Sequence, residues 1–267
     1  MKKYLPVSVV IPIFNSSKTI IRCLESVNNQ RGLPSEVIII DDFSNDNSII
    51  IVNDYINNHK LLNIILLKNN TNKGPSFSRN IGILKSKFEY IAFLDSDDTW
   101  HEEKLNIQYN FMKKNKNILL TGHDHINYSN INSFKNLRRI HNKYIYIKFQ
   151  SLLLKNPFIT PSIMIRKNLG VLFDEKIKYM EDFKFILESS QKTAIVKIHN
   201  NLAYIFKHPY ASSGLSSNFI KMFLCEFKVL YFFYQKISLT YFIFLNLYYL
   251  SKFLRRLLII FAYKIRT

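Results

Sequence analysis

The chain has 267 residues, 48% of them hydrophobic, so it carries enough apolar material for one large domain, and the composition excludes a disordered protein. Lysine and arginine outnumber aspartate and glutamate by 37 to 19, giving a formal net charge of +18, which favours a phosphorylated substrate, a membrane surface or a nucleic acid as partner. Cys23 and Cys225 lie far apart in the sequence, which gives no support to a disulfide framework and favours a cytoplasmic protein.

From the N-terminus, apolar β-branched runs alternate with helix-like segments. This alternation predicts an α/β fold with a mostly parallel central sheet and flanking helices. We expect strands at 7–11, 36–40, 63–67 and 90–94, and helices at 19–28, 48–58, 75–85 and 102–114. The helix at 75–85 carries a proline in its first turn, where the missing N–H costs nothing.

The alternation is looser beyond residue 118. A strand-like segment at 118–122 is followed by an ordered segment at 144–154, an extended one at 160–165 and a helix at 181–190. Near residue 217 glycine and proline disappear and aromatic residues become frequent. We therefore expect a first domain at 1–217 and a helical tail at 218–267.

The tail is basic, aromatic and amphipathic. Its longest stretch without a charge, residues 237–251, is 15 residues long, shorter than the roughly 20 apolar residues that a transmembrane helix needs. Lys252, Arg255 and Arg256 are spaced to share one helical face. The pattern predicts a tail that lies on an anionic membrane surface, peripheral to the inner face of the cell membrane. The alternative is a tail that packs on the first domain, or on a second subunit in a homodimer.

Polar residues follow three of the four predicted strands, and others open the helix at 75–85. Because the carboxyl ends of parallel strands meet at one edge of a sheet, we expect these residues to converge. Carboxylates after the second strand can accept hydrogen bonds from a base or a ribose. Those after the fourth strand can hold a divalent cation that bridges to a diphosphate. The sequence therefore predicts a metal-assisted nucleotide site.

Six segments in order carry a resemblance to a known family. They are VSVVIPIFN (7–15), EVIIIDDFSND (36–46), NKGPSFSRNIGI (72–83), YIAFLDSDDTW (90–100), TPSIMIRKN (160–168) and MEDF (180–183). Together they resemble glycosyltransferase family 2, the inverting enzymes with the nucleotide-diphosphosugar transferase fold called GT-A, of the bacterial surface-polysaccharide type. The tail lies outside the resemblance.

The resemblance implies a role for each matching residue. Phe14 would flank the uracil of a UDP-sugar, Asp42 would hydrogen-bond it, and Arg79 would orient the nucleotide. The implied nucleotide-binding set is Pro12, Phe14, Asn15, Asp42, Lys73, Arg79, Asp95 and Ser96. Asp97 would coordinate Mn²⁺ or Mg²⁺ on the diphosphate, and His208 is a candidate third metal ligand or phosphate contact.

Transfer to a hydroxyl also needs a base, because an alcohol is a poor nucleophile until it loses its proton. In the family this base is the second member of an acidic pair, which matches Asp182, with Glu181 in a supporting position. In-line attack opposite the leaving diphosphate would invert the anomeric centre without a covalent intermediate.

Several of these residues have simpler interpretations. Asp41 supports the nucleotide site or, like Asp46, caps the helix that begins near residue 48, and Asp98 caps the helix after Trp100. The triplet 123–125, His-Asp-His, is typical of a polar strand end at the surface more than of a metal site.

The expected function is transfer of one hexose or N-acetylhexosamine from a UDP-sugar to a saccharide acceptor. The basic aromatic tail favours an acceptor on a polyprenyl-diphosphate lipid, in the biosynthesis of O-antigen, lipopolysaccharide, capsule or a related polysaccharide. The alternatives are a metal-dependent nucleotidyltransferase, which leaves Glu181 and Asp182 without a role, and a non-catalytic binder of anionic polymers. The sequence contains no recognised nucleic-acid-binding motif, so nucleic acid is not an expected partner.

Overall fold

A computed structural model of the chain describes residues 3–127, 143–206 and 219–266. Its strands are β1 (Lys3–Ile13), β2 (Gly32–Asp41), β3 (Ile64–Lys68), β4 (Tyr90–Phe93), β5 (Thr99–Trp100), β6 (Leu120–Asn127), β7 (Tyr144–Ile147), β8 (Met164–Arg166) and β9 (Ile195–Ile205). Its α-helices are α1 (Ile20–Asn28), α2 (Ser48–Asn58), α3 (Pro75–Lys85), α4 (Lys104–Lys114), α5 (Phe149–Leu154), α6 (Glu181–Ser189), α7 (Phe219–Phe232) and α8 (Leu239–Arg266).

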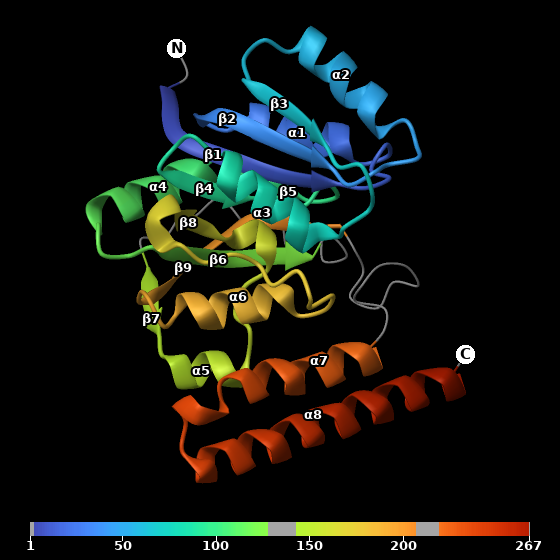
Figure 1. Cartoon of the computed structure of the whole chain (residues 1–267), viewed down its shortest axis with the longest axis vertical. Helices are drawn as coiled ribbons and strands as arrows, with labels where there is room; N and C mark the ends of the chain where they lie inside the picture. The colour runs from blue at the N-terminus through green and yellow to red at the C-terminus, as the bar shows by residue number, and fades with distance from the viewer. Residues whose placement is uncertain (1–2, 128–142, 207–218, 267) are drawn as a thin grey trace.

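The strands form one mixed sheet in the order β3-β2-β1-β4-β8-β6-β9-β5, with β7 paired to β9 (Figure 1). The first four strands are parallel, and all four lie where the sequence predicts them, although β1 and β2 extend further in both directions. Helices α2 and α3 have the predicted bounds. The carboxyl ends of β1, β2 and β4 therefore meet at one edge, as expected for this half of the sheet.

The second half of the sheet differs from the expectation. β8 runs antiparallel to β4 and β6, while β9, which the sequence pattern did not predict, pairs in parallel with β6. The register between β6 and β9 is irregular near Asp124. Such irregularities interrupt the alternation of apolar and polar residues that would have indicated a strand at β9. The segment 144–154 divides into β7 and α5, and the segment 160–165 divides into a 3₁₀ turn at Thr160–Ser162 followed by β8.

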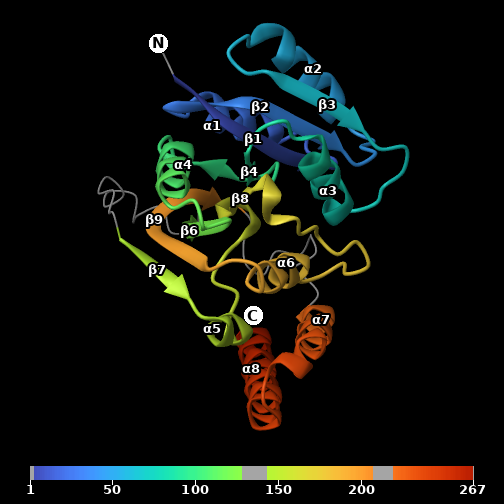
Figure 2. The ribbon, with the colours of Figure 1, turned by 60° about the vertical axis from the view of Figure 1, so that its left-hand side comes forward.

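Helices cover both faces of the sheet. On one face α1, α2 and α4 bury a core with the alternate residues of β1 and β2 (Val7, Val9 and Ile11, with Val37 and Ile39). On the other face α3, α5 and α6 pack on Val10, Ile38 and Ile40. The result is a three-layer α/β/α arrangement, seen from two directions in Figures 1 and 2.

The tail helices α7 and α8 form an antiparallel hairpin beneath α5 and α6 (Figures 1 and 2). The two helices contribute Val229, Leu230, Leu245 and Tyr249 to the same core as α6, and Phe233, directly after α7, joins them. One face of the tail therefore packs on the first domain, as the alternative interpretation of the tail proposed. Within the described ranges, the structure contains no helix that is both long enough and apolar enough to cross a bilayer.

Gly82 lets α3 lie close to the sheet. A Cβ atom added at this position would lie 2.3 Å from Cγ1 of Val10. We expect Gly82→Ala to lower the free energy of unfolding by about 1–3 kcal/mol in urea titrations, even though alanine is the better helix former by about 1 kcal/mol. Leu84→Ala, at an exposed position of the same helix, is the control and should change stability by no more than about 0.5 kcal/mol. Equal stability of Gly82→Ala and wild type would contradict the close contact.

Candidate active site

Two loops at the ends of β1 and β2 hold each other in place. Asn15 donates its backbone N–H to Ser44 Oγ at 3.0 Å, and its side-chain oxygen accepts the N–H of Asn45 at 2.9 Å. Asn15 and Phe43 have left-handed backbone conformations, with φ of 49° and 69°, which is costly for a bulky residue and therefore marks a constrained loop. The rings of Phe14 and Phe43 are 47% and 48% exposed beside this contact. Pro12, also in the predicted nucleotide set, pairs with Ile40 just before the loop.

Asp42 fixes the loop that opens α3. Its carboxylate accepts the backbone N–H groups of Lys73 at 2.9 Å and Gly74 at 2.7 Å, together with the side-chain amide of Asn69 at 2.8 Å. A carboxylate offers about four acceptor positions, so these three donors leave Asp42 room for one further hydrogen bond. The Lys73 ammonium lies 4.3 Å from the centre of the Phe77 ring.

Asp41 and Asp46 have different structural roles. Asp41 is buried and accepts the N–H of Ser44 in the turn after β2, so it does not cap α2. Asp46 accepts the N–H groups of Ser17 and Ser48 at the start of α2. Partial burial disfavours the charge of Asp46, but hydrogen bonds from Ser48 and Ser17 outweigh it and lower the pKa to about 2.

The loop after β4 carries the predicted metal-binding carboxylates. Ser96 Oγ lies 2.7 Å from Ser16 Oγ, which joins this loop to the loop after β1. The backbone carbonyl of Asp97 accepts a hydrogen bond from Arg22 at 2.7 Å, and its side chain is partly exposed. Asp98 is buried and accepts the N–H of Phe206 at the end of β9, whereas α4 begins later, at Lys104.

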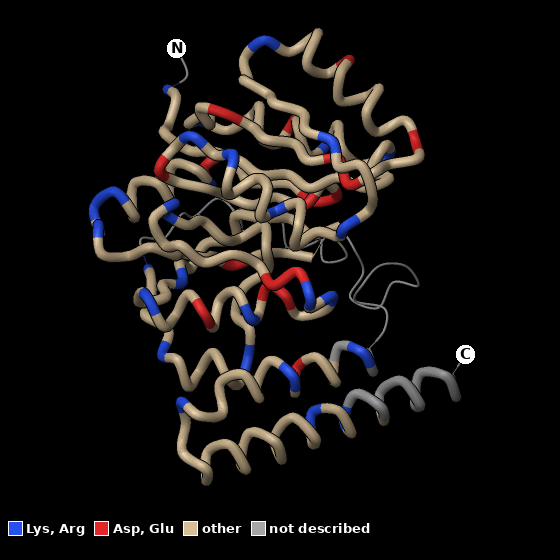
Figure 3. Tube along the Cα trace, viewed as in Figure 1, with Lys and Arg blue, Asp and Glu red and all other residues tan. Residues whose placement is uncertain are grey.

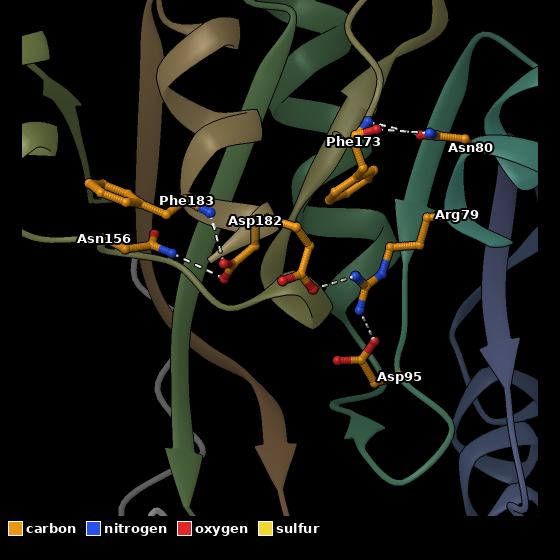
Figure 4. A network of polar contacts seen from close by, with 8 residues as sticks. Arg79, Asn80, Asp95, Asn156, Phe173, Asp182 and Phe183 are labelled. Carbon is orange, nitrogen blue, oxygen red and sulfur yellow. Dashed lines mark hydrogen bonds and ion pairs between the residues drawn. The ribbon is translucent and has the colours of Figure 1, made fainter. Parts of the chain in front are cut away.

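Arg79 on α3 bridges two carboxylates from distant parts of the chain (Figure 4). Its guanidinium donates to Asp95 at 2.8 Å and to Glu181 at 3.1 Å, and only 4% of the residue is exposed. Burial alone would lower the pKa of Arg79, but the charges of Asp95 and Glu181 outweigh burial and raise it, so the group stays protonated. Arg79 therefore joins the carboxyl end of β4 to the first turn of α6.

Asp182, the next residue on α6, lies beside this bridge. Oδ1 accepts the N–H of Phe183 at 2.7 Å, and Oδ2 accepts the side-chain amide of Asn156 at 3.1 Å (Figure 4). The side chain keeps some exposure to solvent. Desolvation and the negative charge of Glu181 raise the pKa of Asp182 to about 7. A carboxyl with this pKa can accept a proton near neutral pH.

The oxygen donors of the β4 loop fit a hard divalent cation. Magnesium in nucleotide sites is commonly held by one or two carboxylates together with substrate phosphates, and Asp95 and Asp97 offer such a pair. Across the ranges 3–127, 143–206 and 219–266, no three His, Cys, Asp or Glu side chains are grouped to hold a metal without a substrate. His208 lies outside the described residues.

Two further features differ from the sequence interpretation. His123 is fully buried, not at the surface, and Asp124 pairs with Lys197 and His199. Asn156, which holds Asp182, was not predicted, because it lies in an irregular segment and no spacing rule relates it to the acidic pair.

Loss of the Arg79 bridge should be costly. We expect Arg79→Leu to lower the free energy of unfolding by about 3–5 kcal/mol, because Asp95 and Glu181 would be left without their shared cation. Urea unfolding followed by circular dichroism measures the change. Arg31→Leu is the control, since Arg31 pairs with Glu102 and Glu103 at the exposed surface and its loss should have little effect. Similar small effects of both substitutions would show that the bridge does not hold the site together.

Comparisons with known proteins agree with this architecture. Residues 8–171 match the model of the family described as glycosyl transferase family 2. An uncharacterised glycosyltransferase of Haemophilus influenzae is 30% identical over 242 residues, which cover 89% of this chain and 93% of that protein.

Two further relatives have more specific names. The Escherichia coli UDP-Glc:alpha-D-GlcNAc-diphosphoundecaprenol beta-1,3-glucosyltransferase WfaP is 41% identical over 110 residues, which cover 41% of this chain and 42% of that protein. The crystal structure of S. aureus TarS residues 1–349 in complex with UDP-GlcNAc matches with a TM-score of 0.66 and 22% identity, over 84% of this chain and 66% of that one, which shows that the two share the GT-A fold. The chain belongs to glycosyltransferase family 2.

Proposed function

We propose that the protein transfers one sugar from a UDP-sugar to a saccharide acceptor, with inversion and with Asp182 as the catalytic base. The observation that carries this proposal is the partly exposed carboxyl of Asp182, whose pKa is raised to about 7 beside the bridge that leads to the β4 loop. Family membership favours transfer of a sugar over the nucleotidyltransferase and polymer-binding alternatives.

The donor site is proposed at the shared edge of β1, β2 and β4. The UDP-GlcNAc complex of TarS, a protein of the same fold, supports a UDP-sugar as the donor. Phe14 is exposed enough to cover a base, and Asp42 retains one acceptor position for it. Pro12, Asn15, Lys73 and Ser96 complete the proposed site.

Mn²⁺ or Mg²⁺ is the proposed cofactor, held by Asp97 with Asp95 beside it. When bound, such a cation would neutralise negative charge on the leaving diphosphate. The buried Arg79 keeps Asp95 and Glu181 in position without itself facing solvent. Its proposed role in nucleotide binding is therefore indirect, through Asp95.

The proton of the acceptor hydroxyl is proposed to pass to Asp182. Asn156 and the N–H of Phe183 orient the carboxylate, and Glu181, held by Arg79, raises its basicity by like charge. One base is sufficient for a direct displacement that inverts the anomeric carbon.

The acceptor is proposed to be a saccharide on a lipid diphosphate, at the anionic inner face of the cell membrane. The name of WfaP, which specifies a diphosphoundecaprenol acceptor, supports this class. The tail from 219 onward contains eight basic residues and one acidic residue, Glu226, which favours an anionic surface as a partner. Biosynthesis of O-antigen, capsule or a related polysaccharide is the corresponding role.

Binding of the donor can be tested without knowing the sugar. UDP with Mn²⁺ should raise the melting temperature of the protein, because a ligand at about 100 times its Kd adds about 2.7 kcal/mol to the folded state. GDP and ADP should stabilise less. Asp97→Ala should remove the dependence on Mn²⁺, whereas Asp54→Ala, at an exposed carboxylate of α2, should leave it unchanged. Equal stabilisation by UDP with and without Mn²⁺ would overturn the metal assignment.

The role of Asp182 can be tested by the pH dependence of transfer. The rate should rise with pH through about 7, because only the ionised carboxylate accepts a proton. Asp182→Asn should lower the rate by about 10²–10⁴-fold. It should not destabilise the fold, since the raised pKa means that the ionised Asp182 lowers stability, by an amount that grows as pH rises from the ordinary aspartate value of 3.8 to about 7 and is constant above it.

Asn156→Ala provides a second test of the same base. Loss of its hydrogen bond to the ionised carboxylate should raise the pKa of Asp182 and move the rise in rate to higher pH. Asn63→Ala, at an exposed amide before β3, is the control and should leave the profile unchanged. If the pH dependence of the transfer rate in Asp182→Asn equals that of wild type, the base is another group.

A further inference from the structure

Helix α8 is apolar on two opposite faces. Leu245 and Tyr249 on one face are buried against the first domain. The other face carries a stripe of six exposed aliphatic side chains, Leu239, Ile243, Leu247, Leu250, Leu254 and Leu258. At 3.6 residues per turn they fall within an arc of about 100° and extend for about 29 Å. Leu239 is 73% exposed and Leu247 is 62% exposed, so solvent covers much of this aliphatic stripe.

Aromatic and basic side chains border the aliphatic stripe. Phe244, Tyr248 and Arg255 are exposed along one side of it on α8. Leu224 and Tyr231 of α7, together with exposed Lys228, extend the apolar and basic character onto the second helix of the hairpin. An exposed apolar surface of this extent marks an interaction site, and a border of aromatic and basic residues is typical of helices that lie in a membrane interface.

The distribution of charge distinguishes between a bilayer and a second copy of the chain. The only acidic residue of the tail, Glu226, is buried and pairs with Lys252 at 3.0 Å. Figure 3 marks basic positions along both tail helices, and because Glu226 is buried, the described surface of the tail presents basic groups and no carboxylate side chain. Two such surfaces would bring like charges together, whereas a leaflet with anionic headgroups complements them.

The tail also contacts both segments that hold Asp182. The Tyr249 hydroxyl donates to the carbonyl of Leu153 in α5 at 2.8 Å, and Asn156 lies two residues after the end of that helix. The Lys184 ammonium of α6 lies 4.0 Å from the centre of the Phe232 ring of α7. A surface bound to the tail would therefore be held in a fixed position relative to α6.

We propose that the aliphatic stripe of α8 inserts into an anionic lipid leaflet, with the α7–α8 hairpin lying flat on it. In this orientation α5 and α6 form the next layer above the hairpin (Figure 1), and Asp182 lies in the first turn of α6. The consequence of this inference, delivery of a lipid-held acceptor to Asp182, rests on the proposed function. Binding of the tail to lipid can be tested without measuring catalysis.

Flotation with vesicles is the test. Wild type should bind vesicles of phosphatidylcholine and phosphatidylglycerol. The double variant Leu247→Gln/Leu254→Gln should bind the same vesicles at least about tenfold more weakly. The control Ile50→Gln/Leu84→Gln changes two equally exposed aliphatic residues on α2 and α3 and should bind as wild type. Lys228→Glu/Arg255→Glu should weaken binding to the anionic vesicles by several-fold at low salt. Removal of the whole tail is not suitable, because it would also remove core residues such as Val229 and Tyr249.

Two kinds of result, in vesicle binding or in oligomeric state, would overturn the proposal. One is binding of Leu247→Gln/Leu254→Gln at the level of wild type, or no binding by wild type. The other is a dimer in sedimentation velocity that the same double variant dissociates, which would assign the aliphatic stripe to a second copy. Stabilisation by UDP is measured on every variant. If the protein binds UDP but not vesicles, only the membrane-surface proposal is rejected. If it binds vesicles but not UDP, only the transferase proposal is rejected.

Discussion

The ion pairs of Arg79 are the contact on which the rest of the site depends. The two carboxylates that Arg79 holds belong to the end of β4 and the start of α6, which no backbone hydrogen bond joins. A buried guanidinium is stable only when both charge and hydrogen bonding are satisfied. Asp95 and Glu181 supply the charge and accept from both terminal nitrogens, while the buried Nε has no hydrogen-bond partner among the described residues. The positions of the proposed donor loop and of the proposed base are therefore set by the same side chain.

The fold of the half that carries the proposed donor site could be predicted from sequence because each of its signals is local. Proline in the first turn of α3 and carboxylates directly after a buried strand need no knowledge of distant residues. The second half depends on contacts between distant residues. β9 is recognised as a strand through its pairing with β5, β6 and β7, and Asn156 is recognised as a partner of Asp182 only once α5 and α6 are packed together. The Arg79 residue was predicted, but its burial between two carboxylates was not, since burial is a property of the packed fold.

The tail shows why amphipathic patterns leave a choice open. A sequence with apolar residues on two helical faces satisfies both the packing interpretation and the surface interpretation, and in α8 one face is buried against the first domain while the other is exposed. The buried face carries Leu245 and Tyr249, and the Tyr249 hydroxyl satisfies its hydrogen bond at the end of α5. Burial of such a face contributes about 25 cal/mol per Å² of apolar area to the free energy of unfolding. The hairpin therefore adds to the stability of the domain core.

The bridge of Arg79 also has a consequence for the order of folding. Arg79 and Glu181 are separated by 102 positions in the chain. A ribosome delivers the parallel strands and α3 well before α6. Until α6 arrives, Arg79 lacks Glu181 and has only the contacts that the earlier chain supplies, among them Asp95 and the Phe173 ring. A nascent chain can therefore assemble the proposed nucleotide half before the proposed base, Asp182, is in place. Long-range closure of this kind is slow, and it makes catalytic competence one of the last properties that the chain acquires.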